Sequence, residues 1–313
     1  MGMTKIDVAK PGVIPVVSAT MGEATHLDRQ ERIQLIRAVR SALDENGLHQ
    51  TPIVAGVGAT STRETISLAK DAEAAGAEFV LVIAPSYYAS ALKASPTAIK
   101  SFFIDVASKS PVPMYTRLLF AALVKFYVED RKGLLANKDA GQIRIIYNFP
   151  LVAGGIDLTS DDIVDIARAA PNIRGIMLSC GNVGKVSRIT SLLDGSFKTI
   201  AGFIDFLLPS ISVGSAGAIS PLPNLAPEFA MELWRSTQSL DSAADWAKAR
   251  RLQEIASLAE AELLSGGVAG LKYLLNQQFG YPATPRLPLQ PLSVDAAARL
   301  SNEKYLKDLM EVR

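Results

Sequence analysis

The stretch 52–85 reads PIVAGVGATSTRETISLAKDAEAAGAEFVLVIAP and decides the fold class. An apolar run begins at Pro52, a segment with helical spacing of apolar residues covers 61–75, and a second apolar run begins at Glu78. Short Val- and Ile-rich runs on either side of an amphipathic segment are typical of two parallel strands joined by a crossover helix. The stretch therefore predicts one β-α-β unit.

The same alternation recurs along the chain and predicts an α/β protein with a parallel sheet. Further strand candidates begin at Val13, Arg144, Ile173, Lys198 and Gly217. Helical patterns are expected over 29–44, 160–169, 226–237, 243–264, 268–278 and 294–310. No repeat or Gly/Ser linker marks a second domain. We therefore expect residues 1–313 to form a single barrel domain with a C-terminal helical extension over about 221–313.

The number of strand candidates bears on whether the barrel closes. Seven candidates are one fewer than the eight strands of a (β/α)8 barrel. A barrel that lacks one strand has two unpaired sheet edges, which expose backbone N–H and C=O groups. We expect another segment of the chain, or a partner chain, to cover these edges.

Composition and charge exclude several classes of partner. The 32 basic and 31 acidic residues leave a formal net charge of +1, so no nucleic-acid partner is expected. The apolar stretch 118–128 is too short to cross a bilayer and contains Lys125, so no membrane association is expected. The single cysteine, Cys180, excludes an internal disulfide, and the opening residues do not form a signal-peptide pattern. These features favour a soluble intracellular protein, with the cytoplasm as the expected compartment.

Side chains that bind metals or phosphates are scarce in this sequence. His26, His49 and Cys180 are its only histidine and cysteine residues, so no metal centre is expected. The stretch 181–185, GNVGK, is similar to a phosphate-binding P-loop, but Ser179 occupies the place of its first glycine. We expect no cofactor.

Two strand candidates carry residues of interest at their C-terminal ends, where barrel enzymes have their active sites. In 144–150, RIIYNFP, alternation gives Tyr147 the same face as the isoleucine two residues earlier. In 173–182, IRGIMLSCGN, Met177 shares a face with Ser179. If both faces point into the barrel, Tyr147 and Met177 stand on neighbouring strands. Plain core packing explains the same pattern, and the residues alone do not choose between the two interpretations.

Many collinear stretches resemble the dihydrodipicolinate synthase and N-acetylneuraminate lyase family, nearest its branch of 4-hydroxy-2-oxoglutarate and 2-keto-3-deoxy-sugar-acid aldolases. From about residue 18 to 292 they read, in the family's order, MGEATHLDRQER, PIVAGVGATSTRETISLAKDAEAAGAEFVLVIAPSYY, YNFP, GIDLTSD, PNIRGIMLSCGNVGK, AGFIDFLLP, GAISPLPNLAP, GLKYLL and PRLPLQPL. The resemblance implies a TIM (β/α)8-type barrel with extra C-terminal helices. It also implies a class I, pyruvate-type aldolase, which is a carbon–carbon lyase acting on a small 2-oxo acid.

One position departs from the chemistry of this family. A lysine on the sixth strand of its members forms an imine with the keto carbon of a 2-oxo acid, in a pattern like G-x-K-x-[TS]. The corresponding residues here are GIMLS at 175–179, so the resemblance implies that Met177 replaces the Schiff-base lysine. A thioether has no N–H and cannot become an iminium. We expect covalent catalysis at this position to be absent.

Other site positions of the family are partly kept. Tyr147 matches the tyrosine that relays protons near the imine, and Tyr87 matches a tyrosine that lines the same site. The carboxylate-binding loop, usually like G-[ST]-[TN]-G-E, reads ATMGE at 19–23, where Thr20 keeps a hydroxyl and Met21 removes a polar donor. The substrate-binding residues that the resemblance implies are Thr20, Met21, Tyr87, Ser179 and Gly202.

Two departures in architecture accompany these substitutions. The first strand-helix unit of the family is missing or fused, because GVIPVV at 12–17 runs directly into SATMGE at 18–23. An insert over 115–144 interrupts a strand that is continuous in the family. The insert is expected at the barrel face opposite the active site, outside the ligand pocket and less ordered than the barrel. We expect the chain to form a homo-oligomer.

Three functional interpretations remain open. The chain is a lyase of the family that uses Tyr147 and Thr20 noncovalently, a catalytically silent homologue that binds a small molecule or a partner subunit, or a biosynthetic enzyme whose reaction needs no imine. Lys185 is the nearest spare amine. We expect it to begin the helix after GNVG and to face solvent, so that it does not replace the missing lysine.

Overall fold

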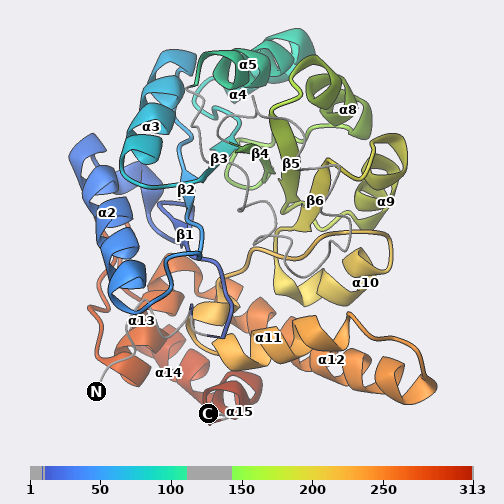
Figure 1. Cartoon of the computed structure of the whole chain (residues 1–313). Helices are drawn as coiled ribbons and strands as arrows, with labels where there is room; N and C mark the ends of the chain where they lie inside the picture. The colour runs from blue at the N-terminus through green and yellow to red at the C-terminus, as the bar shows by residue number, and fades with distance from the viewer. Residues whose placement is uncertain (1–8, 10, 111–142, 312–313) are drawn as a thin grey trace.

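A curled parallel sheet forms the centre of the protein. The computed structural model describes Ala9, residues 11–110 and residues 143–311. The six strands are hydrogen-bonded in chain order: β1 (Val16–Val17), β2 (Val54–Gly56), β3 (Phe79–Ile83), β4 (Ile143–Asn148), β5 (Ile173–Leu178) and β6 (Lys198–Ala201). Figure 1 shows them curling around a common axis with helices outside. This is the arrangement of an α/β barrel.

Helices that follow the strands cover the outer face of the sheet (Figure 1). They are α2 (Arg29–Glu45), α3 (Thr62–Ala74), α4 (Ala89–Lys93), α5 (Pro96–Lys109), α8 (Ser160–Ala169) and α9 (Val183–Leu192). Local polar residues start several of them: the carboxylate of Asp28 accepts from the backbone N–H of Glu31, and Thr159 caps α8 through Asp162 in the same way. Such caps satisfy N–H groups that have no partner within the helix.

The C-terminal extension is helical, as expected from its apolar spacing. Its elements are α10 (Leu207–Ile211), α11 (Pro227–Ser236), α12 (Ala243–Ser265), α13 (Gly267–Phe279), α14 (Val294–Asn302) and α15 (Lys304–Glu311). The chain also contains the short 3-10 helices η1 (Ala24–His26), η2 (Ile204–Phe206) and η3 (Leu222–Asn224). Figure 1 shows α11 to α15 gathered on one side of the barrel, beside β1. Their packed apolar side chains form a second core, separate from that between the sheet and its outer helices.

The barrel wall is not continuous on the side of the C-terminal helices. The strand expected at Gly217 is reduced to an isolated parallel bridge between Ala201 and Ala218. Within residues 11–110 and 143–311, no strand pairing joins this segment to β1. The sheet therefore has two ends, and helices of the same chain lie beside them, which is one of the two coverings expected from the sequence.

The predicted insert falls almost entirely on residues that the structure does not describe. Its last two residues, Ile143 and Arg144, belong to β4, so the strand begins earlier than the sequence pattern indicated. The rest of the 115–144 insert lies outside the described residues. Its expected position at the face opposite the site stays a prediction.

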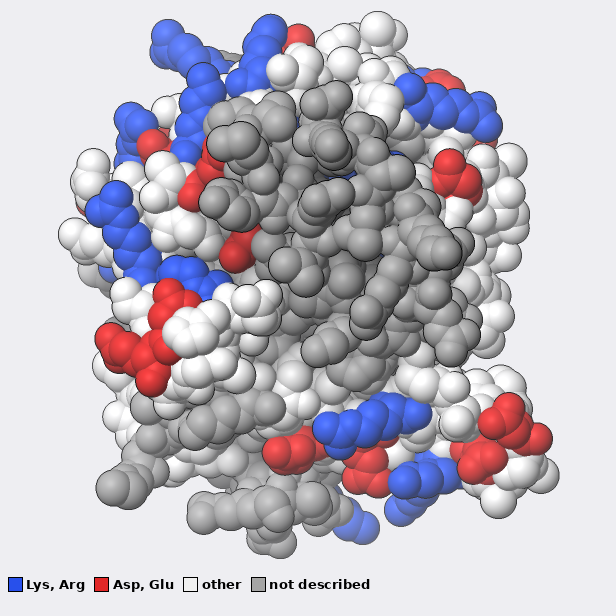
Figure 2. Space-filling model, in the orientation of Figure 1, with Lys and Arg blue, Asp and Glu red and all other residues white. Residues whose placement is uncertain are grey.

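Charged residues of both signs are mixed on the surface of the protein. Figure 2 shows lysine and arginine interspersed with aspartate and glutamate on the face that it draws. In the described part of the chain, no helix is both long and apolar enough to cross a membrane.

Two polar side chains of α12 form hydrogen bonds that join this helix to the barrel. The side-chain amide of Gln253 donates to the backbone carbonyls of Ile204 and Asp205, while its oxygen accepts from the Leu208 N–H. Two turns further on, Glu260 accepts from the Asp205 N–H at 2.8 Å and hydrogen-bonds to the hydroxyl of Ser220. Each hydrogen bond satisfies a backbone or hydroxyl group that the C-terminal helices bury.

Glu260 is a carboxyl group in an apolar environment. It is 0% exposed, and none of the ion pairs among the described residues involves it. Burial raises its pKa from 4.5 to about 8; the hydrogen bond to Ser220 opposes this shift, and the nearby Asp205 adds to it. Glu260 is therefore protonated in the folded protein at neutral pH.

We predict that Glu260→Gln stabilises the protein at alkaline pH. Because the folded-state pKa lies above the ordinary value, the contribution of Glu260 to stability is full below about pH 4.5 and is lost as the pH rises to about 8. A glutamine amide keeps both hydrogen bonds and does not ionise. The free energy of unfolding near pH 8 should rise by about 1 kcal/mol or more.

The measurement is urea unfolding of both proteins between about pH 5 and pH 8. The matched control is Glu262→Gln, because Glu262 is exposed on the same helix and should give no pH-dependent difference. Equal pH profiles for wild type and Glu260→Gln would show that the buried carboxyl does not titrate in this range.

Candidate active site

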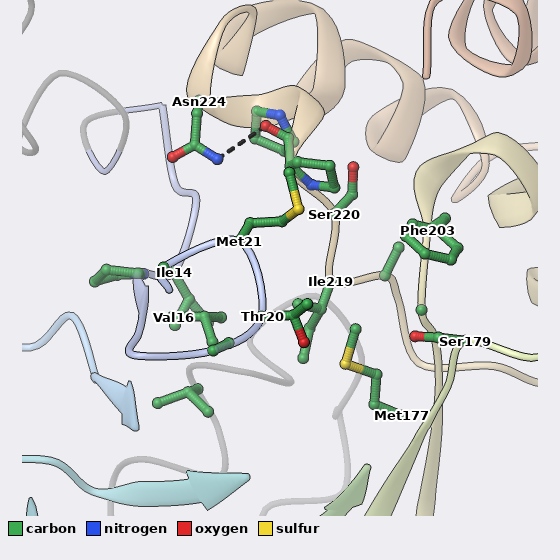
Figure 3. A pocket seen from close by; sticks show the side chains of 18 of the residues that line it. Ile14, Val16, Thr20, Met21, Met177, Ser179, Phe203, Ile219, Ser220 and Asn224 are labelled. Carbon is green, nitrogen blue, oxygen red and sulfur yellow. Dashed lines mark hydrogen bonds between the residues drawn. The ribbon is translucent and has the colours of Figure 1, made fainter. Parts of the chain in front are cut away.

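A cavity of about 1050 Å³ occupies the centre of the barrel. Inward-facing strand residues line it, among them Val54, Phe79, Ile145, Tyr147 and Met177. Figure 3 shows Thr20 and Met177 pointing into the same space. Pockets that bind small molecules are concave, mostly apolar and contain a few polar groups. The lining of this cavity has that composition.

Strand register places the two residues singled out in the sequence side by side. Tyr147 on β4 pairs with Met177 on β5, and Met177 pairs with Ile200 on β6. Both Tyr147 and Met177 line the cavity, as strand alternation predicted. Burial raises the pKa of the Tyr147 phenol, opposed by the hydroxyls of Thr20 and Ser179, so the group is neutral at physiological pH and can donate a hydrogen bond.

The loop after β1 brings Thr20 to Tyr147. The two hydroxyl oxygens lie 3.2 Å apart in a hydrogen bond. The loop starts at Ser18, whose φ of 57° is left-handed, and its backbone lies directly against Gly56, where a β-carbon would collide with the Ser18 carbonyl. This close approach needs glycine at position 56. Two neutral hydroxyls therefore meet at the cavity wall beside Met177.

Charged groups at the rim of the cavity are already paired. Lys272 on α13 donates to Glu23 at 2.8 Å, and the other oxygen of Glu23 accepts from the Arg286 N–H at 2.5 Å. Burial raises the pKa of Glu23, but these hydrogen bonds outweigh it and hold the pKa below its ordinary value. The guanidinium of Arg286 in turn pairs with Glu31. The network ties the loop after β1 to the C-terminal helices.

The family model for the dihydrodipicolinate synthetase family matches residues 5–119 and 112–308 of the chain. This match covers nearly the whole sequence and agrees with the curled parallel sheet. The chain belongs to the dihydrodipicolinate synthetase family.

Two named relatives and one solved structure are similar to this chain over most of its length. An Emericella nidulans protein named "Probable 4-hydroxy-2-oxoglutarate aldolase, mitochondrial" is 38% identical over 296 residues, which are 93% of this chain and 83% of that protein. The L-threo-3-deoxy-hexylosonate aldolase of Aspergillus niger is 31% identical over 331 residues, covering 98% of this chain and 88% of its own. The structure of YagE from E. coli K12, solved in complex with pyruvate, has a TM-score of 0.75 at 25% identity and covers 97% of this chain and 89% of its own.

Two further residues proposed from the family motifs line the same cavity. Ser179 follows β5, and its backbone N–H donates to the Asn148 carbonyl at 2.9 Å. Gly202 follows β6 and lies so close to Ser179 that a β-carbon at position 202 would overlap its side chain. Only glycine fits this contact. Residue 202 therefore positions Ser179 by packing.

The remaining two residues differ in their placement. Met21 lines the cavity and packs against the C-terminal core. Tyr87 does not line it: its side chain is 77% exposed, and its ring packs edge-on against Tyr88 with centroids 4.9 Å apart. The expectation that Tyr87 lines the site is not met within this chain, because the loop after β3 turns its two tyrosines outward.

Lys185 does not face solvent, contrary to the sequence interpretation. Its side chain is 5% exposed, and its ammonium lies 2.5 Å from the Asp157 carboxylate and donates to the Leu158 carbonyl at 2.7 Å. Asp157 also accepts from the side-chain amide of Asn148. Lys185 does not line the cavity. Its role is structural, because it joins the start of α9 to the segment before α8.

A different amine, which sequence reasoning missed, does line the cavity. Lys198 begins β6 and pairs with Gly175, so it lies two residues before Ile200 and shares its inward face. Burial lowers its pKa, opposed by the nearby Asp194. Alternation within KTIAGF was a sufficient signal to find it. Lys198 lies at the N-terminal end of its strand, whereas Tyr147 and Ser179 lie at C-terminal ends.

The protein lacks groups of metal-binding side chains in its described part. Neither residues 11–110 nor 143–311 contain three or more His, Cys, Asp or Glu side chains grouped to hold a metal ion. The polar groups that line the cavity include hydroxyls, backbone groups, the paired charges at its rim, and Arg174 and Lys198 near the N-terminal ends of their strands.

We predict that Lys185→Met destabilises the fold without touching the cavity. The substitution leaves Asp157 without its cation and the Leu158 carbonyl without its donor, which should lower the free energy of unfolding by about 1–3 kcal/mol. Urea unfolding measures this change. The control is Lys248→Met, because Lys248 forms an exposed pair with Glu232 whose loss should cost less than about 1 kcal/mol. Equal losses in the two variants would contradict a structural role for Lys185.

Proposed function

We propose that the cavity binds a small 2-oxo acid noncovalently and that the imine chemistry of the family is absent at its usual position. The observation that carries the proposal is the place of Met177, which lies on β5 inside the cavity and beside Tyr147. The resemblance of residues 175–179 to the family motif G-x-K-x-[TS] implies that Met177 stands at the position of the imine-forming lysine. A thioether has no proton to lose and cannot condense with a carbonyl.

Binding of a 2-oxo acid is supported by the hydroxyls around Met177 and by the relatives. Thr20 and Tyr147 are both neutral donors at one wall of the cavity, and either can donate to a carboxylate or keto oxygen. Relatives of the chain are named as aldolases of 2-oxo acids, and YagE was solved with pyruvate. Cytoplasmic location remains an expectation, and the E. nidulans relative is named as mitochondrial.

What the site can do chemically depends on these hydroxyls. Tyr147 can pass a proton to or from a bound keto oxygen, with Thr20 as its hydrogen-bond partner. Such a site can bind and orient a 2-oxo acid and can promote a reaction that needs only proton transfer. A catalytically silent binding subunit has the same contacts. Turnover of a bound 2-oxo acid distinguishes these two functions.

We predict that Tyr147→Phe weakens binding of pyruvate. Losing one hydrogen bond to a charged ligand should raise the Kd roughly tenfold, whereas the folded structure keeps the same ring. Isothermal titration calorimetry with pyruvate measures the effect. The control is Tyr273→Phe, whose hydroxyl bonds to Ser301 away from the cavity and should leave the Kd unchanged. Unchanged affinity in Tyr147→Phe would remove Tyr147 from the binding site.

We further predict that wild-type protein incubated with pyruvate and borohydride gives no adduct, while Met177→Lys does. Reduction traps only an imine that has formed, and burial in the cavity lowers the pKa of an introduced lysine, as imine formation requires. Intact-mass measurement and peptide mapping locate any adduct. The same variant should gain retro-aldol activity on a 4-hydroxy-2-oxo acid.

One matched control and two further outcomes decide how this experiment is interpreted. Met177→Leu should fold and remain unlabelled, which separates the effect of the amine from the effect of substitution. A wild-type adduct at Lys198 or Lys272 would overturn the noncovalent proposal, because both amines line the cavity. A folded but inert Met177→Lys would show that the loop over 19–23 no longer binds a 2-oxo acid, which favours the silent function.

A further inference from the structure

The cavity is larger than a small 2-oxo acid requires. Its volume of about 1050 Å³ is at the upper end of the roughly 300–1000 Å³ that is typical of sites for drug-sized ligands. Pyruvate is far smaller than such a ligand and would leave most of this space to water. Since water occupies about 30 Å³ per molecule in the liquid and needs polar partners, the lining decides what else the cavity can hold.

The lining comes from both sides of the barrel wall. Val54, Phe79 and Ile145 face the cavity from inside the sheet, whereas Met231 on α11 and Val268 on α13 face it from the C-terminal helices. In a closed barrel, strands would separate these two sets of residues. Here β1 is two residues long, and in the described chain it does not pair with the segment at Ala218. The cavity is therefore continuous from the barrel axis into the space between the helices.

The helix side of the cavity, which we call the helix arm, is apolar. Its apolar side chains on α11, α12 and α13 are those of Ala230, Met231, Trp234, Leu264, Val268, Leu271 and Leu275. Among the residues of α11, α12 and α13 that line the cavity, the charged one is Lys272, which is already paired with Glu23. The hydroxyls of Thr20 and Tyr147 lie on the other side, at the barrel wall. One cavity thus combines a polar spot with a separate apolar extension.

We propose that the natural ligand of this cavity is a 2-oxo acid with an extended apolar chain, whose head lies at Thr20 and Tyr147 and whose chain occupies the helix arm. This inference rests on the proposed function for the position of the head. Apolar cavities bind apolar groups because neither surface then remains hydrated. Each methylene that enters the helix arm strengthens binding by a similar amount.

The test is calorimetric titration of the full chain with a homologous series: pyruvate, 2-oxobutanoate, 2-oxohexanoate, 2-oxooctanoate and 2-oxodecanoate. The Kd should fall by about fourfold for each methylene until the helix arm is filled. A Kd that does not change with chain length, or that rises, would overturn the inference. Pyruvate binding without a gain along the series would leave the proposed function intact while refuting this one.

Titration with octanoate and decanoate separates the contribution of the 2-oxo group to affinity from that of the alkyl chain. They should bind more weakly than the 2-oxo acids of the same length. Equal affinity for a fatty acid and the 2-oxo acid of the same length would show that the cavity binds alkyl chains without recognising the 2-oxo group. This result would overturn both the identity of the head and the proposed function.

A variant that fills the helix arm supplies an independent test. Val268→Trp should flatten the dependence of Kd on chain length. The matched control is Val294→Trp, because Val294 is 84% exposed on α14 and outside the cavity, and it should keep the wild-type slope. An unchanged slope in folded Val268→Trp would overturn the inference. If that variant does not fold, the series on wild-type protein decides alone.

Discussion

Closure of the parallel sheet is the constraint on which the rest of this structure depends. Each sheet end presents backbone N–H and C=O groups that need covering, and β1 and the segment at Ala218 do not pair with each other in the described chain. The C-terminal helices lie on this side and are fastened by buried polar contacts, those of Gln253 and Glu260 on α12 and the Glu23–Lys272 pair on α13. These helices therefore contribute to the wall of the cavity as well as to stability.

Much of the fold could be predicted because it rests on local patterns. Apolar runs marked the strands, and alternation placed Tyr147 and Met177 on inward faces of neighbouring strands. The same rule places Lys198 on the inward face that it shares with Ile200. Contacts between distant segments were not predictable in this way. The partner of Lys185 lies 28 residues earlier in the chain, and that of Glu260 lies 40 residues earlier.

The placement of Tyr87 shows that motif similarity does not predict the direction of a loop side chain. A motif fixes which residue follows a strand, but the direction of its side chain depends on the path of the following loop. After β3 that path packs Ala89 against Gly154 and leaves the rings of Tyr87 and Tyr88 exposed. Thr20 is different, because its loop is held against Gly56 on one side and by Glu23 on the other. Loops with such tertiary contacts keep their position relative to the site.

Under the proposed function, methionine at position 177 avoids a cost that an imine-forming lysine would impose. A lysine buried in an apolar cavity is useful only if its pKa falls, and that fall reflects unfavourable burial of the ammonium. Methionine has a similar length, fills the space and buries no charge. On the proposal that Met177 stands where the family has its imine-forming lysine, the substitution favours the fold and removes the electron sink that imine-dependent carbon–carbon cleavage requires. The hydroxyls of Thr20 and Tyr147 can bind a carbonyl and move a proton, but neither can withdraw electrons as an iminium does, so the chemistry that these two hydroxyls can promote is limited to proton transfer.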